Sequence, residues 1–337
     1  MPMFVRKIGI DLGTVNTVVY AEGLGFVVNE PTIVALSYPD NTVIAVGREA
    51  KEMVGKTPED IVAYRPLKDG VIADYYITRA MLKYFISKAL GNFNFFKPDL
   101  VISAPAGITP NEKRAITNAA LESGAKTVAI VKEPILAALG AGIPINSHSG
   151  NMIINIGGGT AEVAVISLGS VVSWSSLRVA GNKFDQAIID LIKRKYSLSI
   201  GEQTAETIKI QIGAALPARQ KLEMETRGRD LISGLPKNII VNSNEIAEAL
   251  NPHLMDIATA AQNVFNNTPP ELVADVMEKG IIISGGGAQI RYIDEFFKRM
   301  LGVEAYIAEE PLFCVAKGSS LILSHLDTYK RTLLNKR

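Results

Sequence analysis

Two glycine-rich turns, about 140 residues apart, carry the residues of this sequence that could do chemistry. Each follows a short apolar run, the first Ile8–Leu12 and the second Ile153–Ile156. Each pattern predicts a strand, a tight turn and a second strand. Because glycine has no Cβ, backbone N–H groups in such turns can approach and face an anion. Two hairpins from two halves of the chain could therefore hold one polyphosphate between them. The turns consist of Gly13, Thr14, Val15 and Asn16, and of Gly157, Gly158, Gly159 and Thr160.

A third glycine turn follows the apolar run Ile281–Ser284 and precedes a helical pattern. Its residues are Gly285, Gly286, Gly287 and Ala288. The three turns together indicate a nucleotide-binding protein. The Gly-x-x-x-x-Gly-Lys-Ser/Thr motif is missing, which excludes a P-loop protein.

Several polar side chains near these turns have two possible roles. Asp11, at the end of the first strand, could hold a hydrated Mg²⁺ against phosphates, because Mg²⁺ keeps several waters and needs few protein ligands. A capping aspartate is the alternative. Glu133 precedes a proline at a predicted helix start, where a carboxylate is a favourable cap. The alternative is that Glu133, with Thr160, orients a water that attacks the γ-phosphate.

Glu206 and Lys209 lie three residues apart on a predicted helix and share a face. They would form a surface ion pair, or they would hydrogen-bond a ribose or an adenine rim. Phe93, Phe95 and Phe96 crowd a turn between two lysines. These rings would either fill the core beneath the loop or insert into an anionic bilayer.

Length and composition set the wider frame. A chain of 337 residues with 47% hydrophobic and 20% charged residues predicts a globular protein of two domains. A net charge of +1 does not favour a nucleic-acid partner. The single cysteine, Cys314, fits a reducing cytoplasm, and no apolar run is long enough for a membrane-spanning helix. The first strand begins too early for a signal peptide to precede it.

Strands followed by helices occur twice along the chain. We expect a duplicated α/β unit with mixed sheets and a cleft between its halves. Apolar spacing predicts helices over 77–90, 111–123, 184–196, 204–214 and 245–265. Residues 31–36 are predicted as one strand, and Trp174, on a later strand, as part of the core.

The three turns, in this order, resemble the two phosphate motifs and the adenosine motif of the actin and heat-shock-chaperone ATPase superfamily. Within it the chain resembles the MreB family of bacterial actins along nearly its whole length. The phosphate turns specify only the superfamily. The stretches Arg65–Asp74 (RPLKDGVIAD) and Thr268–Leu272 (TPPEL) are much narrower signals.

The resemblance implies an actin-like fold, a duplicated ribonuclease-H-like α/β unit with four subdomains around a cleft that holds ATP and Mg²⁺. Subdomain IA would comprise residues 1–32, 77–145 and 311–337, and IB residues 33–76. Subdomain IIA would comprise 146–181 and 245–310, and IIB 182–244.

In that family Glu133 and Thr160 would position the hydrolytic water, and Asp11 and Asn155 would face the metal. The nucleotide would contact Gly181, Asp185, Glu206 and Lys209 besides the three glycine turns. Loop residues Phe93, Phe95 and Phe96 would enter the membrane, and the brief N-terminus would leave them most of that contact.

The implied partners are further copies of the chain, stacked head to tail and commonly paired antiparallel at the inner face of the cell membrane. A membrane-protein anchor and paralogous subunits are further implied partners. The implied role is an ATPase of the cytoskeleton that governs cell shape or motility.

The sequence departs from the family pattern around the phosphates. Asn155 replaces the usual aspartate, Ala161 a second threonine, and Lys132 and Asn182 stand where acids are common. These changes remove negative charge, so we expect ATP binding with slow hydrolysis. A filament protein with negligible hydrolysis is the main alternative, and a small-molecule kinase of the same superfamily is a weaker one. A chaperone is disfavoured, since no peptide-binding domain follows.

Overall fold

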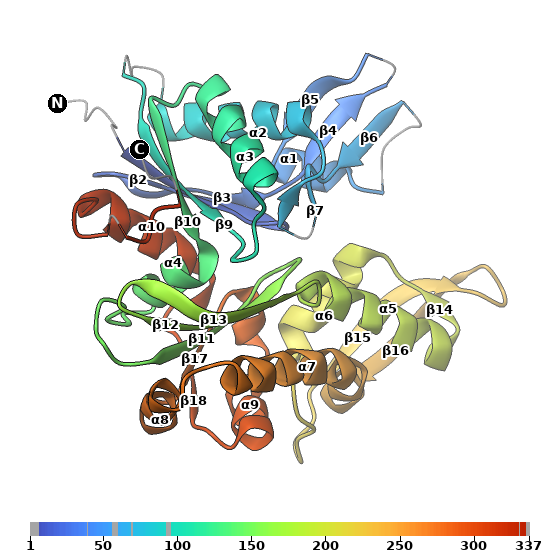
Figure 1. The fold of residues 1–337 in the computed structure, drawn as a ribbon. Coiled ribbons are helices and arrows are strands. Elements are labelled where there is room, and N and C mark those ends of the chain that lie inside the picture. Colours follow the sequence, from blue (N-terminus) through green and yellow to red (C-terminus); the bar gives the residue numbers. More distant parts are fainter. Residues whose placement is uncertain are drawn as a thin grey trace.

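The computed structural model describes residues 7–38, 40–55, 60–68, 70–91, 96–329 and 331–334. The chain forms two lobes, each built on a five-stranded sheet (Figure 1). In lobe I the order is β10-β9-β1-β2-β3, and in lobe II it is β13-β12-β11-β17-β18. The lobe I strands are β1 (Lys7–Leu12), β2 (Asn16–Ala21), β3 (Gly25–Pro31), β9 (Asp99–Ala104) and β10 (Thr127–Lys132). The lobe II strands are β11 (Asn151–Ile156), β12 (Ala161–Ser167), β13 (Ser170–Leu177), β17 (Ile281–Ser284) and β18 (Ala305–Ile307).

The two central sheets share one topology. In each, three consecutive strands form an antiparallel meander. A later strand pairs in parallel with the first of these, and another pairs in parallel with that later strand. The duplicated α/β unit predicted from the sequence is therefore confirmed. Both glycine hairpins are confirmed as well, since β1 pairs antiparallel with β2 and β11 with β12.

Each lobe carries a smaller sheet beside its central one. In lobe I this sheet has the order β5-β4-β6 and is followed by a short β7–β8 pair. In lobe II it has the order β14-β15-β16. The bounds are β4 (Val34–Ser37), β5 (Thr42–Val46), β6 (Ile61–Tyr64), β7 (Leu67–Lys68), β8 (Val71–Ile72), β14 (Leu198–Ser199), β15 (Glu223–Asp230) and β16 (Pro236–Asn242).

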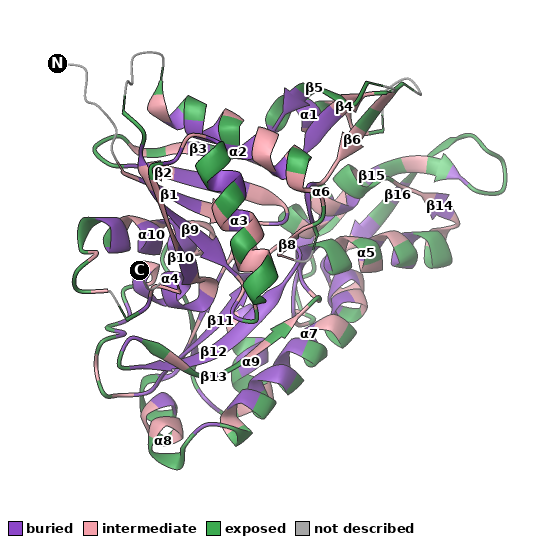
Figure 2. Cartoon of the chain, turned by 45° about the horizontal axis from the view of Figure 1, so that its top comes forward, coloured by how far each residue is buried: buried purple, intermediate pink, exposed green. Residues whose placement is uncertain are grey.

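Helices cover the sheets and bury their apolar faces on them, while their outer faces stay exposed (Figure 2). The predicted helical segments are confirmed with shifts of at most three residues at their ends. The helices are α1 (Arg48–Met53), α2 (Tyr75–Leu90), α3 (Pro110–Glu122), α4 (Glu133–Gly140), α5 (Gly181–Tyr196), α6 (Glu202–Ile212), α7 (Ser243–Asn266), α8 (Pro270–Lys279), α9 (Ile293–Leu301) and α10 (Cys314–Ser324), with 3₁₀ turns η1 (Gly286–Gln289) and η2 (Pro311–Phe313). Within the described ranges, no helix is both long and apolar enough to cross a bilayer.

Helices α4 and α10 join the two lobes at the closed end of the molecule. A Cβ on Gly140 would lie 1.8 Å from the Cys314 carbonyl oxygen, and one on Gly318 would lie 2.0 Å from that of Leu136. Glycine at these two points lets the helix backbones touch. Apolar side chains of both lobes, such as Val101 and Ile153, pack in one cluster with these helices. The lobes therefore share a core at their base.

Two predictions about strands were wrong. Residues 31–36 do not form one strand, because β3 ends at Pro31 and β4 begins at Val34. The break is at Thr32, whose hydroxyl donates to the Gly13 carbonyl (2.7 Å) and so supports the first glycine turn. Trp174 is 44% exposed rather than in the core. It lies on the edge strand β13, where Ser173 points inward and the alternation of side chains places Trp174 outward.

Candidate functional site

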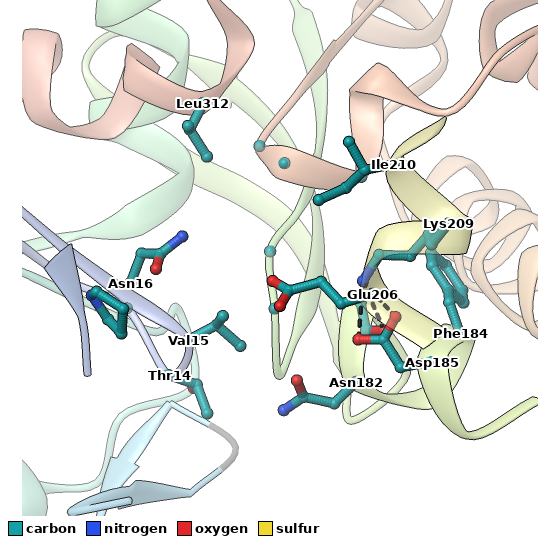
Figure 3. Close-up of a pocket in the computed structure, with 18 of the residues that line it drawn as sticks. Thr14, Val15, Asn16, Asn182, Phe184, Asp185, Glu206, Lys209, Ile210 and Leu312 are labelled. Atoms are coloured by element: carbon teal, nitrogen blue, oxygen red, sulfur yellow. Dashed lines mark hydrogen bonds and ion pairs between the residues drawn. The ribbon is translucent and has the colours of Figure 1, made fainter. Parts of the chain in front are cut away.

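A cavity of about 760 Å³ lies between the lobes (Figure 3). That volume is within the usual range for pockets that hold small ligands. Residues predicted for the site line it from both sides: Asp11, Gly13, Thr14, Val15, Asn16, Glu133, Asn155, Gly157, Gly158, Gly181, Asp185, Glu206, Lys209, Gly285, Gly286 and Gly287. Gly159, Thr160 and Ala288 are not among its lining residues, and Thr160 and Ala288 are buried beside it.

The tips of the two hairpins touch each other across the cavity floor. A Cβ on Gly158 would lie 2.1 Å from Val15 Cγ2, and one on Gly159 would lie 2.8 Å from Thr14 Oγ1. Glycine is required at both positions for this close approach. The turns of lobes I and II are therefore in direct contact.

Asp11 is anchored by a serine that the sequence did not single out. Ser103, on the neighbouring strand β9, donates from its hydroxyl to Asp11 Oδ1 (3.0 Å) and accepts the N–H of Leu12 (2.9 Å). Burial raises the pKa of Asp11 to about 6. A polar residue inside the buried run 100–105 was the available signal for Ser103.

Asn155 links Glu133 to the third glycine turn. Its amide Nδ2 donates to Glu133 Oε1 (2.6 Å), and its Oδ1 accepts from the Ser284 hydroxyl (2.8 Å). Glu133 opens α4, and its pKa is raised well above the usual range by burial and then by the charges of Glu162 and Asp11. Both ends of the Asn155 amide are thus engaged within the protein.

Glu162 is a third carboxyl in this region and was missed as a site residue. It has no exposed surface, and its Oε1 accepts the N–H of Ala106 (2.9 Å) from the loop after β9. Burial raises the pKa of Glu162 to about 7. A single charge within the apolar strand AEVAVIS was the signal that could have revealed it.

The interpretation of Glu206 and Lys209 as an ion pair with each other is wrong. Lys209 Nζ pairs with Asp185 (2.8 Å) and donates to the Gly181 carbonyl (3.2 Å). Glu206 pairs instead with Lys51 Nζ of lobe I (2.7 Å). Both lie on α6 as predicted, and Figure 3 shows them entering the cavity from lobe II, opposite Thr14, Val15 and Asn16.

Three further features bear on the predicted partners. Phe93 and Phe95 lie outside the described residues, whereas Phe96 is described and is 46% exposed. Within the described segments, His, Cys, Asp and Glu do not gather in a group of three that could hold a metal ion.

Comparisons with known proteins agree with this geometry. The sequence profile of the family described as MreB/Mbl protein matches residues 5–331. The chain is 50% identical over 332 residues to the cell shape-determining protein Mbl of Bacillus cereus, covering 98% of this chain and 100% of that one. It is 44% identical over 340 residues to the cell shape-determining protein MreB of Escherichia coli K12, covering 99% and 98%.

Solved structures show the same fold. MreB5 of Spiroplasma citri bound to AMPPNP superimposes with a TM-score of 0.92 at 40% identity, covering 98% of this chain and 99% of that one. A MamK double helical filament gives a TM-score of 0.77 at 21% identity, which supports the fold alone, and covers 94% and 98%. The two-lobed, actin-like architecture predicted from the sequence is confirmed. The chain belongs to the MreB/Mbl family of actin-like proteins.

Proposed function

We propose that this chain is a cytoskeletal protein that binds ATP and Mg²⁺ between its lobes, assembles into filaments and takes part in determining cell shape or motility. The observation that carries the proposal is the pair of glycine hairpins that face each other across the cavity. Relatives across the whole chain are named cell shape-determining proteins, and a structure at 40% identity was solved with AMPPNP.

The volume of the cavity and the glycine turns that line it support nucleotide binding. Backbone N–H groups of the turns at 13–16 and 157–160 would hold the phosphates. Lys209 and Glu206 would contact the ribose and base, with Gly285–Ala288 on the other side. Bound ATP would supply the phosphoanhydride bond that is hydrolysed.

The donor set also fits a hydrated Mg²⁺. Asp11 offers a carboxylate at the end of β1, beside the first turn. Asn155 is the weaker candidate, because its oxygen already accepts from Ser284 and its nitrogen donates to Glu133. We therefore assign the metal mainly to Asp11, acting through bound water.

Glu133 and Thr160 are the proposed pair that positions the attacking water. Glu133 would accept a proton from that water. Hydrolysis would be slow for two reasons. Asn155 adds no charge beside Mg²⁺, and its amide holds the carboxylate of Glu133 by a 2.6 Å hydrogen bond.

That same hydrogen bond supports a second candidate, a filament protein that binds nucleotide and barely hydrolyses it. Both candidates share the site and differ in rate. A small-molecule kinase has less support, because it would need a further carboxylate base beside a second substrate pocket. The relatives found over the full length are named for cell shape.

The subdomain boundaries proposed from the family follow the four larger sheets. Subdomains IA and IIA would contain the two five-stranded sheets, IB the β5-β4-β6 sheet and IIB the β14-β15-β16 sheet. Filaments would form by head-to-tail stacking of subunits, paired antiparallel as the family implies, and microscopy tests this pairing. Loop residues 93–96 would contact the inner face of the membrane, with a membrane-protein anchor or paralogous subunits as further partners.

The test is electron microscopy and sedimentation of the purified chain with ATP, with ADP and without nucleotide, while phosphate release is followed in parallel. We expect filaments with ATP and slow phosphate release. Filaments without measurable release would favour the second candidate. A chain that forms no filaments and binds no nucleotide would contradict both candidates. Binding to vesicles with anionic lipids tests the membrane contact separately.

A further inference from the structure

Glu162 is a buried charge that the proposed roles of Glu133 and Thr160 leave unexplained. Its side chain extends from β12 in lobe II and accepts the Ala106 N–H of lobe I at 2.9 Å. All seven residues of β12 are buried, so an apolar side chain would suit position 162 better if stability alone mattered. The packing of the strand therefore does not explain why a carboxyl is present at position 162.

The 105–107 loop, whose Ala106 donates to Glu162, is also in close contact with two other parts of the chain. A Cβ on Gly107 would lie 2.6 Å from the Trp174 ring of lobe II, and one on Gly70 would lie 2.7 Å from Pro105. Gly70 also donates its N–H to Thr14 Oγ1 of the first glycine turn (2.9 Å). The 105–107 loop thus lies between Trp174 of lobe II and Gly70, which donates to the first glycine turn. The position of this loop therefore depends on how the two lobes are placed relative to each other.

Glu162 also lies next to the proposed catalytic pair. It stands directly opposite Asn155 in the β11–β12 register, and Asn155 donates to Glu133. Thr160 precedes Glu162 by two residues on the same segment. A displacement of the Glu162 side chain by its partner in lobe I would therefore move the segment that carries Thr160. It would also move Asn155, which donates to Glu133.

We propose that Glu162 is a positioning residue for ATP hydrolysis: by accepting the Ala106 N–H it ties lobe II to lobe I and holds Thr160 and Glu133 in place when the lobes are closed. The inference rests on the proposed ATPase function and goes beyond it, because it assigns a role to a residue that need not touch nucleotide. The required property is a hydrogen-bond acceptor at this point, not the negative charge.

Substitution at position 162 separates these properties. Glu162→Leu removes the acceptor and leaves the Ala106 N–H unpaired, while it also removes the desolvation cost of a buried carboxyl. Glu162→Gln keeps an oxygen that accepts from Ala106. We expect Glu162→Leu to slow single-turnover phosphate release about tenfold, the effect of roughly one buried hydrogen bond. Its affinity for a non-hydrolysable ATP analogue should stay within about threefold of the parent. Glu162→Gln should release phosphate at nearly the parent rate.

Two further variants keep the test decisive. Ala106→Pro removes the donor from the other side and should slow release as Glu162→Leu does, so it replaces that variant should Glu162→Leu not fold. Glu30→Val is the matched control. Glu30 is also a buried carboxylate that accepts a backbone N–H, from Arg48, and it pairs with Lys88 as well, but all three residues lie in lobe I. Its loss should lower stability and leave phosphate release unchanged.

Parent-like release in Glu162→Leu, or in Ala106→Pro, would overturn the proposal. Equal slowing in Glu162→Gln and Glu162→Leu would overturn it too, because the charge would then be the required property. A parent chain that binds no ATP or releases no phosphate would instead overturn the proposed function itself. The two failures are therefore distinguishable.

Discussion

The two central sheets place different residues at one equivalent position. Asp11 is the second-last residue of β1, and Asn155 is the second-last residue of β11. Each accepts a hydrogen bond from a serine on the next parallel strand, Ser103 in lobe I and Ser284 in lobe II. The backbone arrangement is therefore repeated, and the charge is not.

The difference separates two tasks between the lobes. Lobe I presents an ionisable carboxyl beside its glycine turn, which suits a hydrated cation. Lobe II presents a neutral amide, which can donate to Glu133 where an ionised aspartate could not. The cross-strand neighbours differ as well, since Val18 faces Asp11 while Glu162 faces Asn155. In this duplicated fold, lobe I thus carries the proposed metal contact, Asp11. Lobe II carries Asn155, which donates to the proposed catalytic residue Glu133.

The largest expected effect is at Glu133, the residue held by lobe II. Glu133→Gln keeps an oxygen for the Asn155 amide but cannot take a proton from water. We expect phosphate release to fall about a hundredfold while nucleotide affinity changes little. Single-turnover release and equilibrium titration measure the two quantities. Glu122→Gln, an exposed partner of Arg79, is the control, and parent-like release in Glu133→Gln would exclude the role.

Contact between the two hairpins is tested at Gly158. Gly158→Ala would place a methyl 2.1 Å from Val15 Cγ2 and hold the lobes apart. Overpacking of this kind costs about 1–3 kcal/mol, so ATP-analogue affinity should fall about tenfold or more. Val15→Gly in the same chain should restore much of the affinity by removing the clash. Unchanged affinity in Gly158→Ala would show that nucleotide binding does not need the hairpins in contact.

Asn155→Asp makes the two lobes alike and tests whether the neutral amide slows hydrolysis. It frees Glu133 from its donor and adds a charge beside Mg²⁺, so phosphate release should rise about tenfold. Lys132→Glu should act in the same direction. Release rates measured at saturating ATP and Mg²⁺ decide the matter. A rate equal to or below that of the parent would contradict the explanation for slow turnover.

The two serines provide the smallest test of the comparison. Ser103→Ala removes a hydrogen bond to an ionisable carboxyl and leaves the Leu12 N–H without its acceptor. Ser284→Ala removes one bond to a neutral amide. We expect a loss of about 2 kcal/mol in the free energy of unfolding for Ser103→Ala, and about 1 kcal/mol for Ser284→Ala. Urea denaturation at pH 8, above the pKa of Asp11, measures both. The reverse order would show that the two positions do not differ as described.

Local patterns predicted the parts of the site that depend on backbone shape. A glycine turn between two apolar strands is specified within about ten residues, so both hairpins and the third turn were predicted from the sequence. Asp11 was found because it lies near the end of the first strand, and Glu133 because it opens a helix just before a proline.

Partners from distant segments could not be predicted in this way. Ser103 reaches Asp11, Ala106 reaches Glu162 and Lys51 reaches Glu206 only once the lobes have folded. The error at Trp174 has a related cause. An apolar ring on an edge strand can face either side of the sheet. Because the neighbouring Ser173 is buried, Trp174 faces the opposite, exposed side.

A crystal structure with a non-hydrolysable ATP analogue and Mg²⁺ tests the central claim most directly. The account predicts phosphate oxygens within hydrogen-bond distance of backbone N–H groups in both turns, at 13–16 and 157–160, and a metal-bound water on Asp11. An analogue that binds elsewhere, or that contacts one lobe alone, would contradict it.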